Sequence, residues 1–129
     1  MKERKKVLIV DDEPDIVILL KSRFEASGFT AIGASNGKDG IEKALEEKPD
    51  IILLDLLMPQ MDGYEAMRHL KKNKKTRDIP LILFTAAPLE EVLKKGDNTV
   101  KAIDFVIKPF NEGALSTLIT KVKQLTHCD

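Results

Sequence analysis

The stretch Val7-Leu8-Ile9-Val10-Asp11-Asp12-Glu13-Pro14 sets an apolar run directly against a group of acids and a proline. Four consecutive apolar residues predict a short strand that is buried on both faces. Pro14 suits the first turn of a helix, so the acids lie between a strand and a helix. The stretch therefore predicts the beginning of an α/β fold with acidic side chains at the end of its first strand.

Similar apolar runs recur along the chain. Residues 51–54, 81–84 and 105–107 repeat the pattern, and the weaker run at residues 30–34 suits a strand near a sheet edge because its residues are small. Helical spacing fills the intervals at residues 14–27, 36–47 and 62–70, with a short helix at 88–95 and a last one from a cap at Asn111 to about Leu125. This alternation predicts a doubly wound, five-stranded parallel sheet with helices on both faces.

Length and composition narrow the class of protein. The chain has 129 residues, 43% of them hydrophobic, and its 21 Lys and Arg balance 21 Asp and Glu. These values predict one globular domain over residues 1–129 and argue against disorder. The apolar runs are too short for a membrane span, and no signal peptide is expected. A single cysteine, Cys128, excludes an internal disulfide and favours a reducing, cytoplasmic location.

Polar residues follow the central strands where each apolar run ends. Asp11 and Asp12 follow the first run, Asp55 the third, Thr85 the fourth and Lys108 the fifth. Because binding sites of open parallel sheets form at the carboxyl ends of the strands, we expect these side chains to converge. The pattern predicts a pocket with three carboxylates, one hydroxyl and one amine.

The expected pocket suits phosphoryl chemistry. Three neighbouring carboxylates repel one another unless a positive charge lies among them, and oxygen ligands without histidine favour Mg²⁺. Lys108 adds a positive charge, and Thr85 adds a hydroxyl that can donate to an oxyanion. A carboxylate can itself accept a phosphoryl group, and Asp55 is the candidate because it faces Asp11 and Asp12 from a central strand.

Four motifs occur in order at the ends of the predicted strands. They are Val7-Leu8-Ile9-Val10-Asp11-Asp12-Glu13-Pro14, Asp55-Leu56-Leu57-Met58-Pro59 with Met61-Asp62-Gly63, Phe84-Thr85-Ala86, and Phe105-Val106-Ile107-Lys108-Pro109-Phe110. With these motifs the whole chain resembles a receiver domain of a two-component response regulator. The resemblance implies a flavodoxin-like fold with sheet order 2-1-3-4-5.

The resemblance also implies a role for each site residue. Asp55 would accept the phosphoryl group from a sensor histidine kinase or a histidine phosphotransfer protein. Asp12 and Asp55 would bind Mg²⁺ directly, Asp11 through water, and Leu57 through its backbone carbonyl. Lys108 would neutralise phosphoryl oxygens.

Two further residues would form a switch by the same resemblance. Thr85 would move toward the phosphoryl group and Phe105 would turn inward, which would change the face that binds a downstream effector protein. The chain is thus expected to be a signalling domain that promotes its own phosphorylation and dephosphorylation without turning over a substrate. No direct contact with nucleic acid or membrane is expected, and the chain is expected to be a monomer or a weak phosphorylation-dependent dimer.

The sequence departs from the family pattern in the segments that are expected to form the effector-binding face. The segments at residues 88–99 and 100–105 are atypical, which leaves partner identity and dimer mode open. Two other functions would leave different marks in the sequence. A Mg²⁺-dependent phosphohydrolase of the haloacid dehalogenase type would need an Asp-x-Asp-x-Thr motif after the first strand, and an inert pseudo-receiver would have lost Asp12, Asp55 or Lys108.

Individual residues and runs also have simpler explanations. Asp11 and Asp12 could serve as charges at a helix N-terminus, Thr85 as an ordinary strand residue and Lys108 as a surface amine. The basic runs at residues 2–6 and 71–77 could contact nucleic acid or anionic lipid, although solvated charge is the favoured interpretation.

Overall fold

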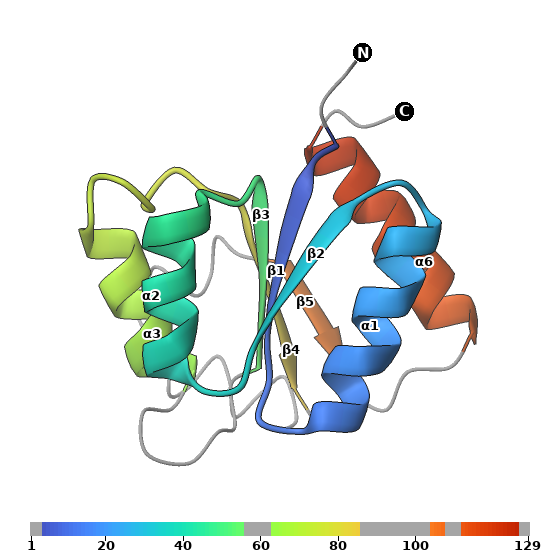
Figure 1. Ribbon diagram of the computed structural model, residues 1–129, viewed down its shortest axis with the longest axis horizontal. Coiled ribbons are helices and arrows are strands. Elements are labelled where there is room, and N and C mark those ends of the chain that lie inside the picture. Colours follow the sequence, from blue (N-terminus) through green and yellow to red (C-terminus); the bar gives the residue numbers. More distant parts are fainter. Residues whose placement is uncertain (1–3, 56–62, 86–103, 108–111, 127–129) are drawn as a thin grey trace.

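The computed structural model describes residues 4–55, 63–85, 104–107 and 112–126, with only the backbone at Thr85 and at residues 104–107 (Figure 1). Strands and helices alternate along the chain. Their bounds, in order, are β1 (Lys6–Val10), α1 (Pro14–Ala26), β2 (Thr30–Ala34), α2 (Gly37–Glu47), β3 (Ile51–Asp55), α3 (Gly63–Lys72), β4 (Leu81–Thr85), β5 (Asp104–Ile107) and α6 (Glu112–Leu125).

The strands form one parallel sheet in the order β2-β1-β3-β4-β5. β1 lies between β2 and β3, with Val7 opposite Ala31 on one side and opposite Ile51 on the other. The weak run at residues 30–34 is an edge strand, as its small residues predicted. The flavodoxin-like α/β class with a parallel sheet is therefore confirmed.

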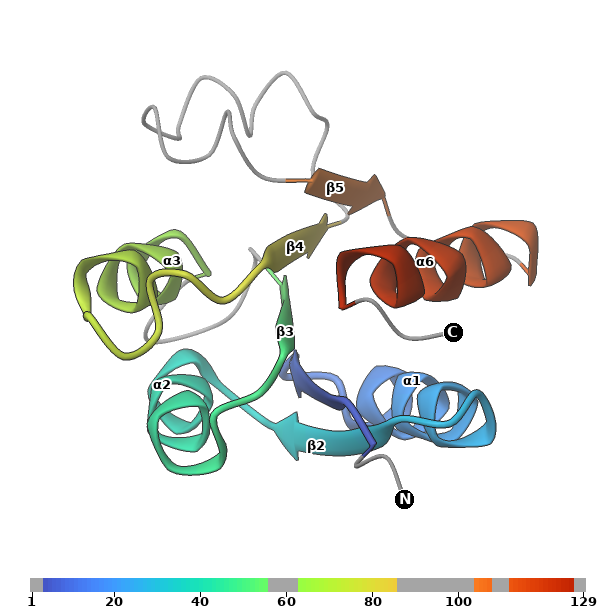
Figure 2. The same ribbon diagram turned by 90° about the horizontal axis from the view of Figure 1, so that it is seen from above.

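Helices cover both faces of the sheet, because the central strands are apolar on both faces. Figure 2 shows α1 and α6 on one side and α2 and α3 on the other. Val7 and Ile9 of β1 belong to the buried cluster that contains residues of α1 and α6. Leu8 and Val10 belong to the cluster that contains residues of α2 and α3. Truncating one of these side chains to alanine costs about 2–5 kcal/mol of stability in typical cores.

Local signals explain where the first two helices begin and end. Pro14 is the first residue of α1, and Gly28, two residues after its end, has a φ of 99° that a side chain would strain. The Asn36 side chain caps α2 by accepting a hydrogen bond of 2.8 Å from the backbone N–H of Asp39. The expected helix at 88–95 and the expected cap at Asn111 lie outside the described residues.

The lengths of the helices bear on membrane insertion. No helix in the described part of the chain is both long enough and apolar enough to cross a membrane.

Candidate functional site

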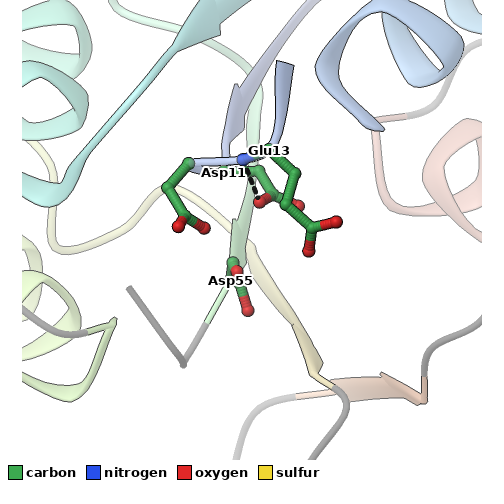
Figure 3. A group of neighbouring side chains, drawn as sticks. Asp11, Glu13 and Asp55 are labelled. Carbon is green, nitrogen blue, oxygen red and sulfur yellow. Dashed lines mark hydrogen bonds between the residues drawn. The ribbon is translucent and has the colours of Figure 1, made fainter. Parts of the chain in front are cut away.

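An acidic cluster lies at the carboxyl ends of β1 and β3, two neighbouring inner strands of the sheet. Val10 pairs with Leu54 in the register of these strands, so Asp11 and Asp55, the residues that follow, are neighbours. Figure 3 shows Asp55 on β3 facing Asp11 and Glu13 of the segment that joins β1 to α1. The expected convergence of Asp11, Asp12 and Asp55 is thus present.

The carboxylates of this cluster are close together. One oxygen atom from each of Asp11, Asp12, Glu13 and Asp55 lies within 4.8 Å of the others. Asp11 is fully buried and Asp55 is 2% exposed, whereas Asp12 and Glu13 are more accessible. The cluster therefore has a buried floor, formed by Asp11 and Asp55, and an accessible rim.

Backbone hydrogen bonds hold the β1–α1 segment in place. The N–H of Asp11 donates to the carbonyl of Ala34 on β2 at 3.1 Å, and the N–H of Glu13 donates to Asp11 Oδ1 at 2.9 Å. The carbonyl of Glu13 accepts the first hydrogen bonds of α1, from Ile16 and Val17. The Asp11 carboxylate is therefore fixed in position before any ligand binds.

The donor set fits a hard dication. Four carboxylates at this separation repel one another, and burial of Asp11 and Asp55 makes their charges more costly. Within the described residues the cluster consists of carboxylates alone, without His or Cys. Carboxylate oxygens suit Mg²⁺, which is bound by one or two carboxylates and by water or phosphate oxygens.

For Thr85 and Phe105, two other predicted site residues, the structure describes only the backbone. Thr85 is the last residue of β4, and the register sets Phe84 of that strand opposite Asp55. Phe105 of β5 pairs with Leu83 of β4. The side chains of Thr85 and Phe105, and the whole of Leu57 and Lys108, lie outside the described residues.

Glu13 also belongs to the cluster, although the sequence pattern predicted only Asp11, Asp12 and Asp55. Glu13 is the residue that precedes α1. Its position directly after Asp11 and Asp12 was the signal, because a tight turn between strand and helix keeps consecutive side chains together.

A cavity of about 400 Å³ opens beside the acidic cluster, between α1 and the end of β2. Asp12 lies on its wall, with Pro14, Val17 and Ile18 of α1 and Gly33 of β2. Ile18 is 65% exposed and its neighbour Leu19 is 40% exposed. The rim of the acidic cluster thus borders an accessible apolar surface on α1.

Comparison with known proteins identifies the family. Residues 7–120 match the response regulator receiver domain. The chain is 37% identical to Protein PilH of Pseudomonas aeruginosa over 117 residues, which cover 91% of this chain and 96% of PilH. It is 41% identical over 107 residues to PhoP of Bacillus subtilis, the alkaline phosphatase synthesis transcriptional regulatory protein, covering 83% of this chain and 43% of PhoP.

Solved structures agree with this assignment. TrrA of Thermotoga maritima, a response regulator solved in complex with Mg²⁺ and BeF, superposes with a TM-score of 0.78 at 34% identity, covering 94% of this chain and 98% of TrrA. The chemotaxis protein CheY4 of Vibrio cholerae superposes with a TM-score of 0.83 at 27% identity, covering 93% of this chain and 99% of CheY4.

Coverage differs between the relatives. The chain spans nearly all of PilH but less than half the length of PhoP and about half that of the ycf27 transcriptional regulators. The region shared with all of them is the receiver domain, whose function is signalling and not substrate turnover. The parallel sheet, the acidic cluster at its carboxyl edge and these matches together show that the chain belongs to the response regulator receiver family, the phosphoacceptor switches of two-component systems.

Proposed function

We propose that Asp55 is the phosphoacceptor of this receiver domain. The single observation that carries the proposal is the position of its carboxylate, 2% exposed and within 4.8 Å of the carboxylates of Asp11 and Asp12. The donor is a phosphohistidine of a sensor histidine kinase or a histidine phosphotransfer protein. A carboxylate oxygen of Asp55 forms a bond to phosphorus while the bond from phosphorus to the histidine nitrogen breaks, and the leaving imidazole takes up a proton.

Mg²⁺ is the proposed cofactor, held by Asp11, Asp12 and Asp55 and by the backbone carbonyl of Leu57. When bound, it neutralises charge on the phosphoryl oxygens. Asp11 is already oriented by the N–H of Glu13, so this part of the site needs no rearrangement. Lys108 and Thr85 complete the proposed site by charge and by hydrogen bonding, following the family pattern.

The proposed switch links this site to a partner surface. Thr85 and Phe105 move when Asp55 is phosphorylated, and the change alters affinity for a downstream effector protein. Thr85 lies on β4 and Phe105 on β5, and these strands are neighbours in the sheet. This arrangement supports a joint response of the two residues to phosphorylation. We propose further that residues 1–129 form one receiver domain, cytoplasmic, and monomeric or weakly dimeric when phosphorylated.

The phosphodonor would approach over α1. Ile18 and Leu19 are 65% and 40% exposed, and Ile18 lines the cavity beside Asp12. Exposed aliphatic side chains beside a reactive group favour contact with a protein. This arrangement supports a protein donor that covers α1 while it presents its phosphohistidine to Asp55.

Intact-mass spectrometry after incubation with acetyl phosphate and Mg²⁺ tests the proposal. We expect one phosphoryl adduct that disappears with EDTA and in Asp55→Asn. Asp15→Asn is the matched control, because Asp15 is an exposed acid in the first turn of α1. An adduct that persists in Asp55→Asn would overturn the assignment, and steady phosphate release without an adduct would favour a phosphohydrolase.

A further inference from the structure

Glu13 is the member of the acidic cluster that the proposed function leaves without a role. One of its carboxylate oxygens lies within 4.8 Å of an oxygen of each of Asp11, Asp12 and Asp55. Figure 3 shows its side chain leaving the β1–α1 segment on the side where Asp55 lies. The cluster therefore contains one carboxylate more than the three that the proposed Mg²⁺ site uses.

The backbone of Glu13 is held on both sides. Its N–H donates to Asp11 Oδ1 at 2.9 Å, and its carbonyl accepts from the N–H groups of Ile16 and Val17 at 3.1 and 3.2 Å. These bonds fix the direction of the Cα–Cβ bond, so the side chain begins beside the cluster. Only the rotamers of Glu13 itself remain to be ordered when a ligand binds, which keeps the entropy cost of binding small.

The Glu13 side chain does not cap the helix that it precedes. A polar side chain at the N-cap of a helix usually accepts a hydrogen bond from a backbone N–H of the first turn. Glu13 is the N-cap residue of α1, yet its side chain makes no such bond, whereas Asn36 at the N-cap of α2 accepts from Asp39. The Glu13 carboxylate lies instead among three other carboxylates, which repel it unless a cation lies among them.

The charges around the cluster favour a dication. The four carboxylates carry four negative charges when ionised, and the sequence predicts one amine, that of Lys108, in the same pocket. Lys21 and Asp39 line the adjoining cavity together with Asp12, and their opposite charges offset each other. One amine leaves most of the negative charge of the cluster uncompensated. A dication therefore fits this charge better than an amine alone.

We infer that Glu13 is a fourth carboxylate of the metal site, which raises the affinity of the site for divalent cations and for Ca²⁺ most of all. The inference rests on the proposed Mg²⁺ site and adds a residue to it. Mg²⁺ is bound by one or two carboxylates and keeps several waters, whereas Ca²⁺ takes about six to eight oxygen ligands in flexible geometry. Glu13 on the accessible rim thus acts on Mg²⁺ through its charge and offers Ca²⁺ a further ligand. Its presence makes the site less selective for Mg²⁺ over Ca²⁺.

Isothermal titration calorimetry with magnesium chloride and, separately, with calcium chloride tests the inference on the metal-free chain. Glu13→Gln removes the charge and keeps the size of the side chain. We expect this variant to bind Mg²⁺ roughly fivefold more weakly, as the loss of one exposed charge near a dication would cause, and to lose more affinity for Ca²⁺. Unchanged affinity for both cations would overturn the inference. Equal weakening for both would overturn the role of Glu13 as a ligand of Ca²⁺.

Two further variants separate position from charge. Asp15→Asn is the matched control, because Asp15 is an exposed acid in the first turn of α1 and does not belong to the cluster. It should keep nearly the wild-type affinity for both cations. Glu13→Asp retains the charge on a shorter side chain and should recover most of the affinity for Mg²⁺. If Asp15→Asn weakened binding as much as Glu13→Gln does, the general charge of this helix end would be responsible and the inference would fail.

Asp12→Asn distinguishes failure of the inference from failure of the proposed function. If Asp12→Asn weakens Mg²⁺ binding and Glu13→Gln does not, the proposed metal site stands and Glu13 has no part in it. If the wild-type chain binds neither cation, the metal site itself is wrong and the inference falls with it.

Thermal unfolding in EDTA adds a measurement that needs no bound metal. Glu13→Gln and Asp15→Asn each remove one negative charge near the N-terminus of α1, but only Glu13→Gln also relieves repulsion in the cluster. In EDTA, Glu13→Gln should therefore unfold at a higher temperature than Asp15→Asn. Added Mg²⁺ should shrink or reverse this difference, because the variant binds the cation less tightly. An EDTA midpoint for Glu13→Gln below that of Asp15→Asn would contradict the inference.

Discussion

Arg23 Nη1 lies 2.7 and 2.9 Å from the two carboxylate oxygens of Glu112. The pair joins the last turn of α1 to the first residue of α6, two helices that are neighbours on one face of the sheet. The ion pair therefore ties α1, the proposed donor surface, to the helix that follows β5.

The Arg23–Glu112 pair should contribute little to stability. The Glu112 side chain is 79% exposed, so a double-mutant cycle of Arg23→Ala and Glu112→Ala should give a coupling energy of about 0.2–1 kcal/mol, smaller at high salt. Urea unfolding measures it. The Lys6–Glu47 pair, at 3.9 Å, should couple less strongly. A coupling energy unaffected by salt would contradict this account.

Gly33 should not tolerate a side chain. A Cβ at this position would lie 2.7 Å from Val17 Cγ1, so α1 packs directly on the backbone of β2. Gly33→Ala should destabilise the protein by about 1–3 kcal/mol, as overpacking does. In a Val17→Ala background the cost of the same change should shrink, as measured by urea unfolding. An equal cost in both backgrounds would mean that the contact is not responsible.

Thr76 should stabilise the connection between α3 and β4 through its hydroxyl. Thr76→Val removes the hydrogen bond to the carbonyl of Leu70 at a buried position, and should cost about 1–3 kcal/mol. Thr120→Val is the matched control, since its hydroxyl bonds the Ser116 carbonyl on the exposed face of α6. Thermal unfolding of both variants makes the comparison, and similar losses would argue against the buried bond.

Mg²⁺ should stabilise the folded chain, because it relieves repulsion in the acidic cluster. At about ten times its dissociation constant, a ligand of the folded state adds about 1.4 kcal/mol. Asp12→Asn should reduce the thermal shift caused by Mg²⁺, while Asp15→Asn should leave it intact. Unfolding is followed with Mg²⁺ and with EDTA, and an undiminished shift in Asp12→Asn would exclude Asp12 as a ligand.

Lys71 should make stability depend on alkaline pH. Burial lowers the pKa of its ammonium below the ordinary value of 10.5, and the Asp78 carboxylate opposes part of this effect. The unfolded chain then binds the proton more tightly, so the contribution of Lys71 to stability rises as pH increases through the interval between its folded and unfolded pKa.

A comparison of wild type with Lys71→Gln isolates this contribution. The difference in unfolding free energy, wild type minus variant, should grow as the pH rises toward the ordinary lysine pKa of 10.5. Chemical unfolding at a series of pH values measures it. A difference that is constant or falls with pH would show that the Lys71 pKa is not lowered.

The strands of the sheet could be predicted because a short continuous apolar run in a chain of this size has few alternatives to a buried strand. The predicted ends of the strands were less accurate. Lys6 joins β1 because it pairs with Thr30, and Asp55 and Thr85 are the last residues of β3 and β4, although their polar side chains suggested that the strands stop before them. Strand pairing extends one residue past an apolar run where the neighbouring backbone is available.

Contacts between distant segments could not be predicted. The fit of Val17 against Gly33 and the pairing of Arg23 with Glu112 depend on how α1 crosses the sheet and where α6 begins. The acidic cluster was foreseen because parallel strands bring their carboxyl ends to one edge. Glu13, the fourth member of the cluster, could not be predicted, because its place depends on the geometry of the turn between β1 and α1.

The division of each central strand between two buried clusters has a consequence for engineering. Val7 and Ile9 contact one helical layer, and Leu8 and Val10 contact the other, so the sheet backbone separates two cores. Substitutions on opposite faces share no partners and should combine additively. A designer could therefore randomise one core in a library while the other core keeps the register of the sheet and the geometry of the site.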